Sequence, residues 1–227
     1  MSTFSLAATS TVTIEPWELQ GDWNIPRHAY GVVVFCHGTG SSRMSPRNRA
    51  VARRLNEGGL ATLLFDLLNR EEEAEDNWSH HLRFDIPALA ERVVRATDWV
   101  GTRRESAGLP TAYFGASTGA AAALVASVAC AGSVKAIVSR GGRPDLAGDR
   151  LGLVRAPVLL IVGGSDTEVL RLNRKAQARM KNAETRIAVV PGATHLFEEP
   201  GALDEVTQLA LDWFSLHLRD KPASTRW

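Results

Sequence analysis

One serine of the chain stands in a setting that suits nucleophilic catalysis. Ser117 lies in the segment Gly115-Ala116-Ser117-Thr118-Gly119, which follows a strand-like run and precedes an alanine-rich run typical of a helix. Such a strand-turn-helix junction holds the serine in a strained conformation, and flanking glycines remove side chains that would collide there. The pattern predicts a nucleophilic serine at a helix N-terminus; the alternative is a glycine-rich helix start with an incidental serine.

A serine hydroxyl needs a base to accept its proton at neutral pH. Among the six histidines, His195 lies in VVPGATHLFEEPG, after the last predicted strand and before the last predicted helix. This position completes the chain order serine, acid, histidine that the strand-turn-helix motif predicts. His37, in an HG turn, is expected to be structural. Surface or structural roles are also expected for the remaining histidines: His28, His80, His81 and His217.

The imidazole in turn needs a carboxylate that holds its tautomer and stabilises the imidazolium. Asp166 directly follows the predicted strand VLLIVGG, between Ser117 and His195 in the chain. We therefore interpret it as the acid, although an N-cap for the following helix is an alternative. Asp145 and Glu168 are weaker candidates.

Two backbone N–H groups must stabilise the oxyanion that forms during attack on a carbonyl. Thr118 supplies one, as the residue after the nucleophile. Thr39 in the small-residue turn FCHGTGSS, after the first core strand, is expected to supply the other. Because these contacts use the main chain, the two hydroxyls are not required; a plain tight turn is the alternative for this segment.

The elements that position these residues alternate between short apolar runs and helix-period segments from Gly31 onward. This alternation predicts an α/β fold, with a mostly parallel central sheet covered by helices on both faces. The predicted strands are Val32 to Cys36, Ala61 to Asp66, Thr111 to Gly115, Lys135 to Ser139, Val158 to Val162 and Arg186 to Val190. The predicted helices are Pro46 to Glu57, Asp85 to Val100, Ser117 to Cys130, Thr167 to Met180 and Asp204 to His217.

Two further segments lie outside this alternation. Thr11 to Glu18 and Asp22 to Ile25, which flank Gln20-Gly21, predict an antiparallel hairpin at the sheet edge. The polar stretch from Arg70 to His81 is expected to be a surface excursion that could build a lid or pocket wall. Its acidic and histidine residues lack a recognisable metal-ligand spacing, so we expect no metal and no organic cofactor.

Composition limits the class of protein. The chain has 227 residues, of which 44% are hydrophobic, so a single domain over 1–227 is expected. Its formal charge of +1 favours a small-molecule partner over nucleic acid or an anionic membrane. The N-terminus lacks the pattern of a signal peptide and no run is long enough to span a bilayer, which predicts a cytoplasmic protein. Cys36 and Cys130 are expected to be reduced, Cys36 as a buried small hydrophobe, and the protein a monomer or homodimer.

Several motifs together resemble the dienelactone hydrolase-like branch of the α/β-hydrolases, and more closely its serine-nucleophile members, which also occur appended to phosphoribosyltransferase domains. The motifs are FCHGTGSSRMSPRN, LFDLL, HLRFDIPALAERVV, GASTGAAAAL, VSRGGRPDLAG, LLIVGGSD and PGATHLFEEPGALDEV, which run from Gly31 to Leu218. The resemblance implies Ser117 as nucleophile, Asp166 as acid and His195 as base. Dienelactone hydrolases themselves have a cysteine nucleophile and a carboxylate near the position of His37, so dienelactone is not the expected substrate.

We therefore expect a serine esterase that cleaves an ester or lactone of a small molecule through an acyl-enzyme. Arg140 and Arg143 follow a strand at the same edge as the triad. They could bind a substrate carboxylate or phosphate, although salt bridges to Asp145 or Asp149 are the favoured interpretation. Alternatives are a catalytically silent scaffold or engineered variant that acts as a binding protein, and an acyltransferase that passes the acyl group to an alcohol or amine.

Overall fold

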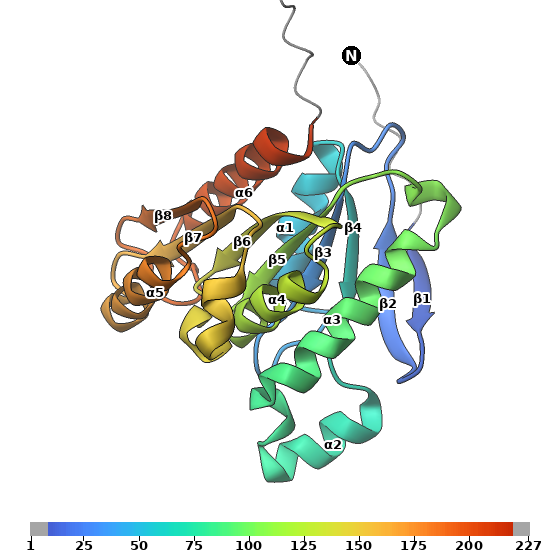
Figure 1. Cartoon of the computed structure of the whole chain (residues 1–227), viewed down its shortest axis with the longest axis horizontal. Helices are drawn as coiled ribbons and strands as arrows, with labels where there is room; N and C mark the ends of the chain where they lie inside the picture. The colour runs from blue at the N-terminus through green and yellow to red at the C-terminus, as the bar shows by residue number, and fades with distance from the viewer. Residues whose placement is uncertain (1–8, 220–227) are drawn as a thin grey trace, which may run out of the picture.

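Eight strands form one mixed sheet in the computed structural model, which describes residues 9–219 of the chain. Their order across the sheet is β1-β2-β4-β3-β5-β6-β7-β8 (Figure 1). The six strands from β4 to β8 in this order are parallel, and β1 and β2 add an antiparallel edge. The strands span Ser10–Ile14 (β1), Leu19–Asn24 (β2), Val32–Cys36 (β3), Ala61–Phe65 (β4), Thr111–Ala116 (β5), Val134–Arg140 (β6), Val158–Gly163 (β7) and Thr185–Val190 (β8).

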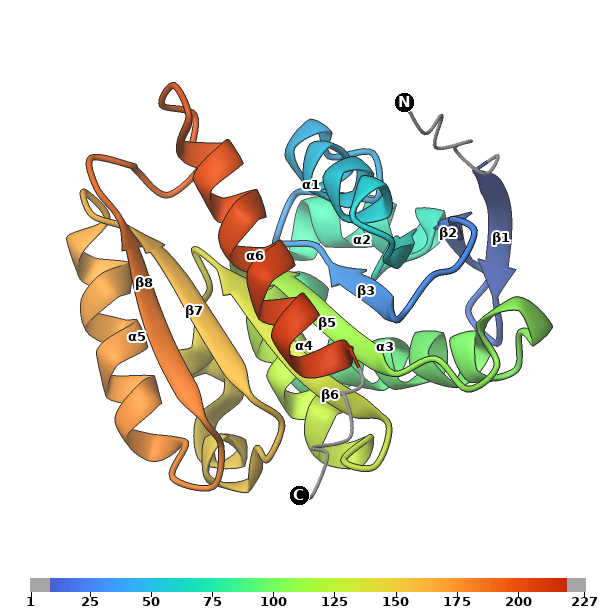
Figure 2. The same cartoon turned by 90° about the horizontal axis from the view of Figure 1, so that it is seen from above.

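Helices cover both faces of this sheet, as the alternation in the sequence predicts (Figure 2). On one face lie α1 and α6, which pack on side chains such as Phe35 and Phe114; on the other lie α3, α4 and α5, over a layer that contains Tyr113. These helices span Pro46–Glu57 (α1), Ile86–Gly101 (α3), Thr118–Ala129 (α4), Thr167–Arg179 (α5) and Ala202–Leu218 (α6). Among the described residues, 3₁₀ turns occupy Leu82–Phe84, Arg104–Ser106 and Pro144–Leu153.

The central strands are apolar on both sides because both faces are covered. Every residue of β3, β4, β5 and β7 is buried, which explains runs such as VVVF and VLLIV. Helix starts also follow from local chemistry: Ser45 accepts the N–H of Asn48 at the start of α1, and Asp85 accepts the N–H of Ala88 at the start of α3. The predicted core strands and helices are all present, and their ends differ by at most two residues from those observed.

The edge hairpin is present, but its turn was predicted in the wrong place. The strands β1 and β2 are joined by residues 15–18, and Gln20 and Gly21 lie within β2. Pro16 has no N–H to donate to a ladder, which favours the turn at that point. Gly21 pairs with both neighbouring strands, and a Cβ there would lie 3.1 Å from Val12 Cγ2. The glycine therefore serves close packing between strands and not the turn.

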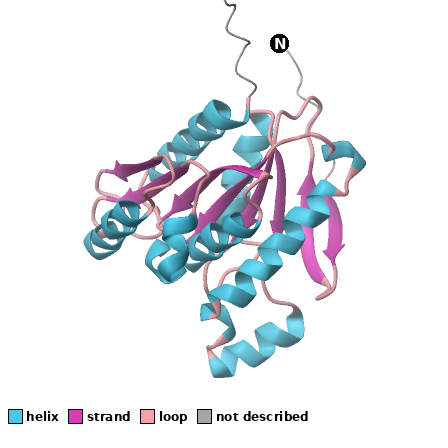
Figure 3. Cartoon of the chain, viewed as in Figure 1, coloured by secondary structure: helices cyan, strands magenta, loops and turns pink. Residues whose placement is uncertain are grey.

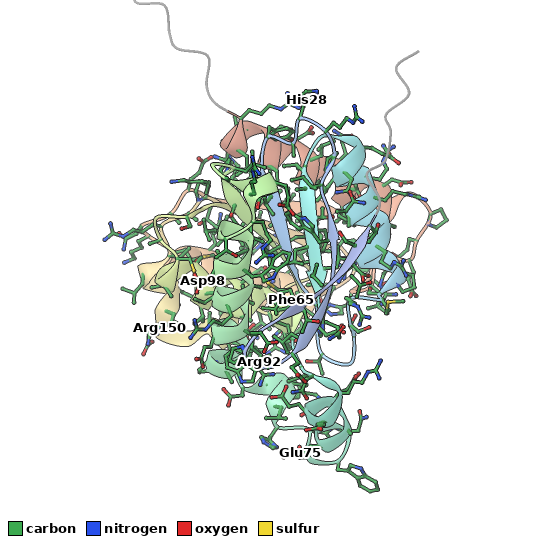
Figure 4. The ribbon with its side chains drawn as sticks, turned by 90° about the vertical axis from the view of Figure 1, so that its right-hand side faces the viewer. His28, Phe65, Glu75, Arg92, Asp98 and Arg150 are labelled. Carbon is green, nitrogen blue, oxygen red and sulfur yellow. The ribbon has the colours of Figure 1, made fainter. Side chains whose placement is uncertain are left out.

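The polar excursion forms a helix, α2, that projects from the body of the molecule (Figures 1 and 3). It spans Arg70–Ser79 and begins with a capping box, in which the side chains of Asn69 and Glu72 each accept a backbone N–H of the other residue. Arg92 of α3, labelled in Figure 4, ties α2 to the body. Its guanidinium donates to Glu72 at 2.6 Å and to the carbonyl of Leu67 at 2.6 Å. A surface helix thus stands beside the edge where the core strands end.

None of the helices in the described part of the chain combines the length and the apolar character needed to cross a bilayer. The N-terminal stretch that was compared above with signal peptides lies mostly outside the described residues.

Candidate active site

The residues singled out from the sequence lie at the carboxyl edge of the parallel strands. Thr39 follows β3, Ser117 follows β5, Asp166 follows β7 and His195 follows β8. Loops at this edge are where open α/β sheets place their ligands.

Ser117 occupies a strained turn between β5 and α4. Its backbone angles, φ 49° and ψ −123°, lie outside the favourable regions for a residue with a side chain. The two flanking glycines are required by contact: a Cβ at Gly115 would lie 2.5 Å from the Cα of Ala120, and one at Gly119 would lie 2.2 Å from the carbonyl oxygens of Cys36 and His37. The turn is thus possible only with glycine on both sides, as the motif predicts.

His195 and Asp166 are joined by a hydrogen bond. The imidazole Nδ1 lies 2.7 Å from Oδ2 of Asp166, with the histidine side chain 39% exposed and the carboxylate 16% exposed. Asp166 does precede α5, the N-cap position, but its side chain makes no capping hydrogen bond. The carboxylate is therefore committed to the histidine, and the other imidazole nitrogen is left for a reacting group.

A short loop after β6 connects Ser117 with His195. The N–H of Ser117 donates to the carbonyl of Arg140 at 3.2 Å, and its carbonyl accepts the N–H of Arg143 at 3.0 Å. Between these two residues, the Cβ position of Gly141 lies 3.5 Å from Nδ1 of His195 and 3.1 Å from its carbonyl oxygen. The serine turn and the histidine loop thus pack on the same four residues.

The two threonines expected to supply oxyanion donors are bonded to one another. The backbone N–H of Thr39 donates to Oγ1 of Thr118 at 2.9 Å, and the two hydroxyl oxygens are also 2.9 Å apart. The N–H of Thr118 is in the first turn of α4, where helical N–H groups lack intrahelical acceptors. The loop is close to the nucleophile, since a Cβ at Gly38 would lie 2.9 Å from Cβ of Ser117. The N–H of Thr39 thus already has an acceptor, which differs from its expected role as a free oxyanion donor, and the two hydroxyls, which were not expected to matter, take part in this hydrogen bonding.

His37 has a structural role in this loop. It is buried; its Nε2 accepts the N–H of Leu67 at 2.9 Å, and its Nδ1 lies 3.0 Å from the carbonyl of Gly38, to which it donates. Burial lowers the pKa of His37, and the hydrogen bond to Gly38 and the charges of Asp66 and Glu73 oppose that shift only in part. The neutral ring holds the end of β3 against the end of β4.

A cavity of about 50 Å³ opens beside the threonine pair. Its walls are the loop 37–42, residues 66–68 after β4, Thr118, and side chains of α2 and the turn that follows it. Apolar surface from Leu67, Leu68 and Leu89 is mixed with polar groups, among them Glu73 and Asn77 of α2. The polar stretch from Arg70 to His81 thus builds a pocket wall, one of the two roles, lid or pocket wall, that were expected for it.

The two arginines of the β6 loop differ sharply. Arg143 forms a two-point ion pair with Asp145, with Nε to Oδ1 at 2.9 Å and Nη2 to Oδ2 at 2.7 Å, as the favoured interpretation predicted. This hydrogen bond raises the pKa of Arg143. Asp149 pairs instead with Arg179 at 2.8 Å. Arg140 is buried, and neither aspartate pairs with it.

The remaining candidates have other surroundings. Glu168 is paired with Arg171, and Asp145 is occupied by Arg143. His28, His80 and His81 are exposed, and the ring of His217 packs against Trp213. Cys36 and Cys130 are free, and burial raises the pKa of both thiols. Among residues 9–219, no group of three or more His, Cys, Asp or Glu side chains is placed to hold a metal ion.

Sequence reasoning missed two residues near the histidine. Glu199 accepts both the N–H and the hydroxyl of Thr194, at 3.0 and 2.6 Å, and so braces the loop that carries His195. Arg47 in the first turn of α1 pairs with Glu198 of the same loop at 2.8 Å. The motif HLFEEPG contained both glutamates, but only the fold shows which groups they meet.

Comparison with known proteins agrees with this architecture. A family model described as the dienelactone hydrolase family matches residues 20–215. The crystal structure of a dienelactone hydrolase from Anabaena variabilis is 51% identical, with a TM-score of 0.89, and the match covers 93% of this chain and 98% of that one. Est1E from Butyrivibrio proteoclasticus, 15% identical with a TM-score of 0.71 over 92% of this chain and all of that one, shares the fold.

A curated relative from Mycobacterium tuberculosis strain H37Rv, provisionally named a phosphoribosyl transferase, is 55% identical over 207 residues. This match covers 91% of the chain but 46% of the relative, so the chain spans about half the length of that protein. From the matched family model and the Anabaena structure, the chain belongs to the dienelactone hydrolase family and has the α/β-hydrolase fold.

Proposed function

We propose that the protein is a serine hydrolase that cleaves a carboxylic ester or lactone of a small molecule through an acyl-enzyme, with Ser117, His195 and Asp166 as its triad. The observation that carries the proposal is the 2.7 Å hydrogen bond between His195 and Asp166, beside a serine held in a strained turn. A carboxylate bound to one imidazole nitrogen makes the other a proton acceptor, which is the requirement for activating a hydroxyl.

In the first half of the reaction, Oγ of Ser117 forms a bond with the substrate carbonyl carbon as Nε2 of His195 takes the hydroxyl proton. The bond to the alcohol oxygen then breaks, and the imidazolium returns this proton to the leaving alcohol. Asp166 stabilises the imidazolium while it exists. Oxyanion donors are worth several kcal/mol because charge develops there only during reaction.

In the second half, a water molecule attacks the acyl carbon and gives its proton to His195. The bond to Oγ then breaks, and the proton returns to Ser117 as the acid leaves. Serine as the nucleophile, with Cys36 buried and its thiol pKa raised, supports an ester or lactone other than dienelactone as the substrate. The cavity next to Thr39 and Thr118 offers room for a small acyl or alcohol group.

The test is a panel of short-chain p-nitrophenyl esters, combined with labelling by a fluorophosphonate probe that reacts with activated serines. We expect the wild type to turn over esters and to label stoichiometrically, and Ser117→Ala to lose both. Ser133→Ala, which changes an exposed serine in the turn after α4, is the matched control and should label like the wild type. Equal ester hydrolysis by wild type, Ser117→Ala and His195→Ala would show that the triad is wrong.

A further inference from the structure

Arg140 is a buried cation without a counter-charge. Its side chain is 9% exposed, and Nη1 is buried with no hydrogen-bond partner. Among the described residues no carboxylate forms an ion pair with it. Burial, together with the positive charge of Arg47, lowers the pKa of Arg140 to about 10. The group therefore stays protonated at neutral pH, and the charge that it feels most is of the same sign.

The neighbouring arginines each form an ion pair with a carboxylate, and Arg140 forms none with the described residues. Arg143 has Asp145, and Arg47 has Glu198. An ionised group that is removed from water without a partner destabilises a fold, so buried charges are almost always paired or bound to a ligand. A guanidinium in this state is ready to bind a planar or tetrahedral oxyanion through two parallel N–H donors.

The position of Arg140 is beside the reacting groups. It is the last residue of β6 and the ladder partner of Ala116, which precedes the nucleophile. Its carbonyl accepts the N–H of Ser117, and the next residue, Gly141, packs against His195. An anion bound by this guanidinium would thus lie next to the bond that Ser117 attacks.

The face of the sheet supports the same assignment. Alternation along β6 puts Arg140 on the side of Ala136 and Val138, which pack with α1 and α6. Arg47 lies on that side, in a first helical turn that contains no acidic residue. The N-terminus of α1 adds partial positive charge there. Two arginines and a helix end therefore favour an anion between β6, α1 and the histidine loop.

We propose that Arg140, supported by Arg47, binds an anionic group, a carboxylate or phosphate, that the substrate carries near its scissile ester. The inference rests on the proposed ester hydrolysis and narrows it to acidic esters. It also explains why one arginine of the motif SRGGRPD is paired with Asp145 and the other is left unpaired.

The first experiment compares two esters that differ only in charge: p-nitrophenyl butyrate, and mono-p-nitrophenyl succinate, in which a carboxylate replaces the terminal methyl group. A third ester, p-nitrophenyl 3-phosphonopropionate, separates phosphate-like from carboxylate groups. We expect the wild type to show a kcat/KM at least tenfold higher for one of the two anionic esters than for the neutral one. Equal or lower values for both anionic esters in the wild type would overturn the proposal without any variant.

Arginine variants test which residue causes the preference for anionic esters. In Arg140→Gln the ratio of anionic to neutral kcat/KM should fall at least tenfold, with a smaller fall in Arg140→Lys, which keeps the charge but not the fork of donors. Arg143→Gln, from the same loop but paired with Asp145, should keep the wild-type ratio. A ratio unchanged in Arg140→Gln would assign Arg140 a structural role, even if both rates fell. If that variant does not fold, Arg140→Lys and Arg47→Gln carry the same comparison.

A second experiment needs no catalysis. The arginine side-chain ¹⁵Nε resonances of the wild type are followed during titration with succinate, inorganic phosphate, or sodium chloride at matched ionic strength. Saturable movement of the Arg140 resonance with succinate or phosphate, but not with chloride, supports the anion site. No movement with either anion overturns it. Because this readout is independent of ester turnover, a binding site without esterase activity would refute the proposed function and leave the anion site standing.

Discussion

The backbone N–H of Thr39 donates a 2.9 Å hydrogen bond to the hydroxyl of Thr118, the residue after the strained serine. The two groups belong to loops after different strands, β3 and β5, and together they border the cavity beside α2. In this arrangement the N–H of Thr39, which the sequence predicts as an oxyanion donor, already has the threonine hydroxyl as its acceptor. The side chain of Thr118 therefore ties the loop after β3 to the turn that carries Ser117.

This bond predicts that the Thr118 hydroxyl matters for the rate of reaction. Thr118→Val keeps the shape of the side chain but leaves the N–H of Thr39 without its acceptor, so the loop after β3 loses the contact that fixes it beside Ser117. We expect kcat on p-nitrophenyl esters to fall about tenfold to a hundredfold, less than the roughly hundredfold to thousandfold loss caused by removal of an oxyanion donor itself. Thr118→Ser, which retains the hydroxyl, is the control and should stay within about threefold of wild type. Wild-type kcat in the valine variant would show that the bond has no role in catalysis.

Asp166 can be distinguished from its competitors by substitution with amides. Asp166→Asn removes the charge that stabilises the imidazolium and favours the wrong histidine tautomer, so kcat should fall about a thousandfold or more. Glu168→Gln is the matched control, because Glu168 lies two residues away and pairs with Arg171. Steady-state kinetics of the two variants shows which carboxylate acts as the acid. A larger loss of kcat in Glu168→Gln than in Asp166→Asn would contradict the assignment of Asp166.

Much of this arrangement follows from the sequence because the signals are local. Apolar runs, which are fully buried in the structure, predict the parallel strands. The turn around Ser117 is predicted by its two flanking glycines, at which a Cβ atom would collide with the backbone. The pairing of His195 with Asp166 follows from chain order, since each residue comes after a parallel strand and such strand ends share one edge. For these features, local pattern and fold agree.

Other features depend on contacts across the fold and were not predictable in the same way. The hairpin turn was placed at Gly21, because glycine marks turns as well as close strand packing, and only the register distinguishes the two. Arg140 is unpaired because, within residues 9–219, the fold brings no carboxylate within reach of it, and Asp145 pairs with Arg143 instead. The bond between Thr39 and Thr118 depends on two side-chain positions that no spacing rule determines.

The ion pair that ends α2 predicts a pH-dependent stability. Burial raises the pKa of Asp76, but the hydrogen bonds and charge of Arg83 outweigh this effect and hold the pKa below its ordinary value of 3.8. A carboxyl with a depressed pKa in the folded state stabilises the fold fully above its unfolded value, and loses this contribution as pH falls toward the folded value.

We therefore expect Asp76→Asn to have a lower melting temperature than the wild type at pH 7, with the difference shrinking below about pH 4. Thermal unfolding measured across pH 3 to 7 gives the melting temperatures of both proteins and the pH dependence of their difference. Glu75→Gln, on the adjacent exposed position of α2, is the control and should match the wild type throughout (Figure 4). A difference for Asp76→Asn that stays constant down to pH 3 would show that the charge of Asp76 is not what stabilises α2.

Gly119 tests whether the serine turn is sterically determined. Its Cβ position lies 2.2 Å from the carbonyl oxygens of Cys36 and His37, both of which belong to backbone that cannot move aside cheaply. Gly119→Ala should therefore lower the free energy of unfolding by about 3 kcal/mol or more, the upper range for overpacking, and displace the loop that carries Thr39. Gly132→Ala is the matched control, because a Cβ at that position meets no atom within 4 Å, and its effect should stay within about 0.5 kcal/mol. Urea denaturation measures both variants, and the steric account fails if Gly119→Ala unfolds at the wild-type midpoint with full esterase activity.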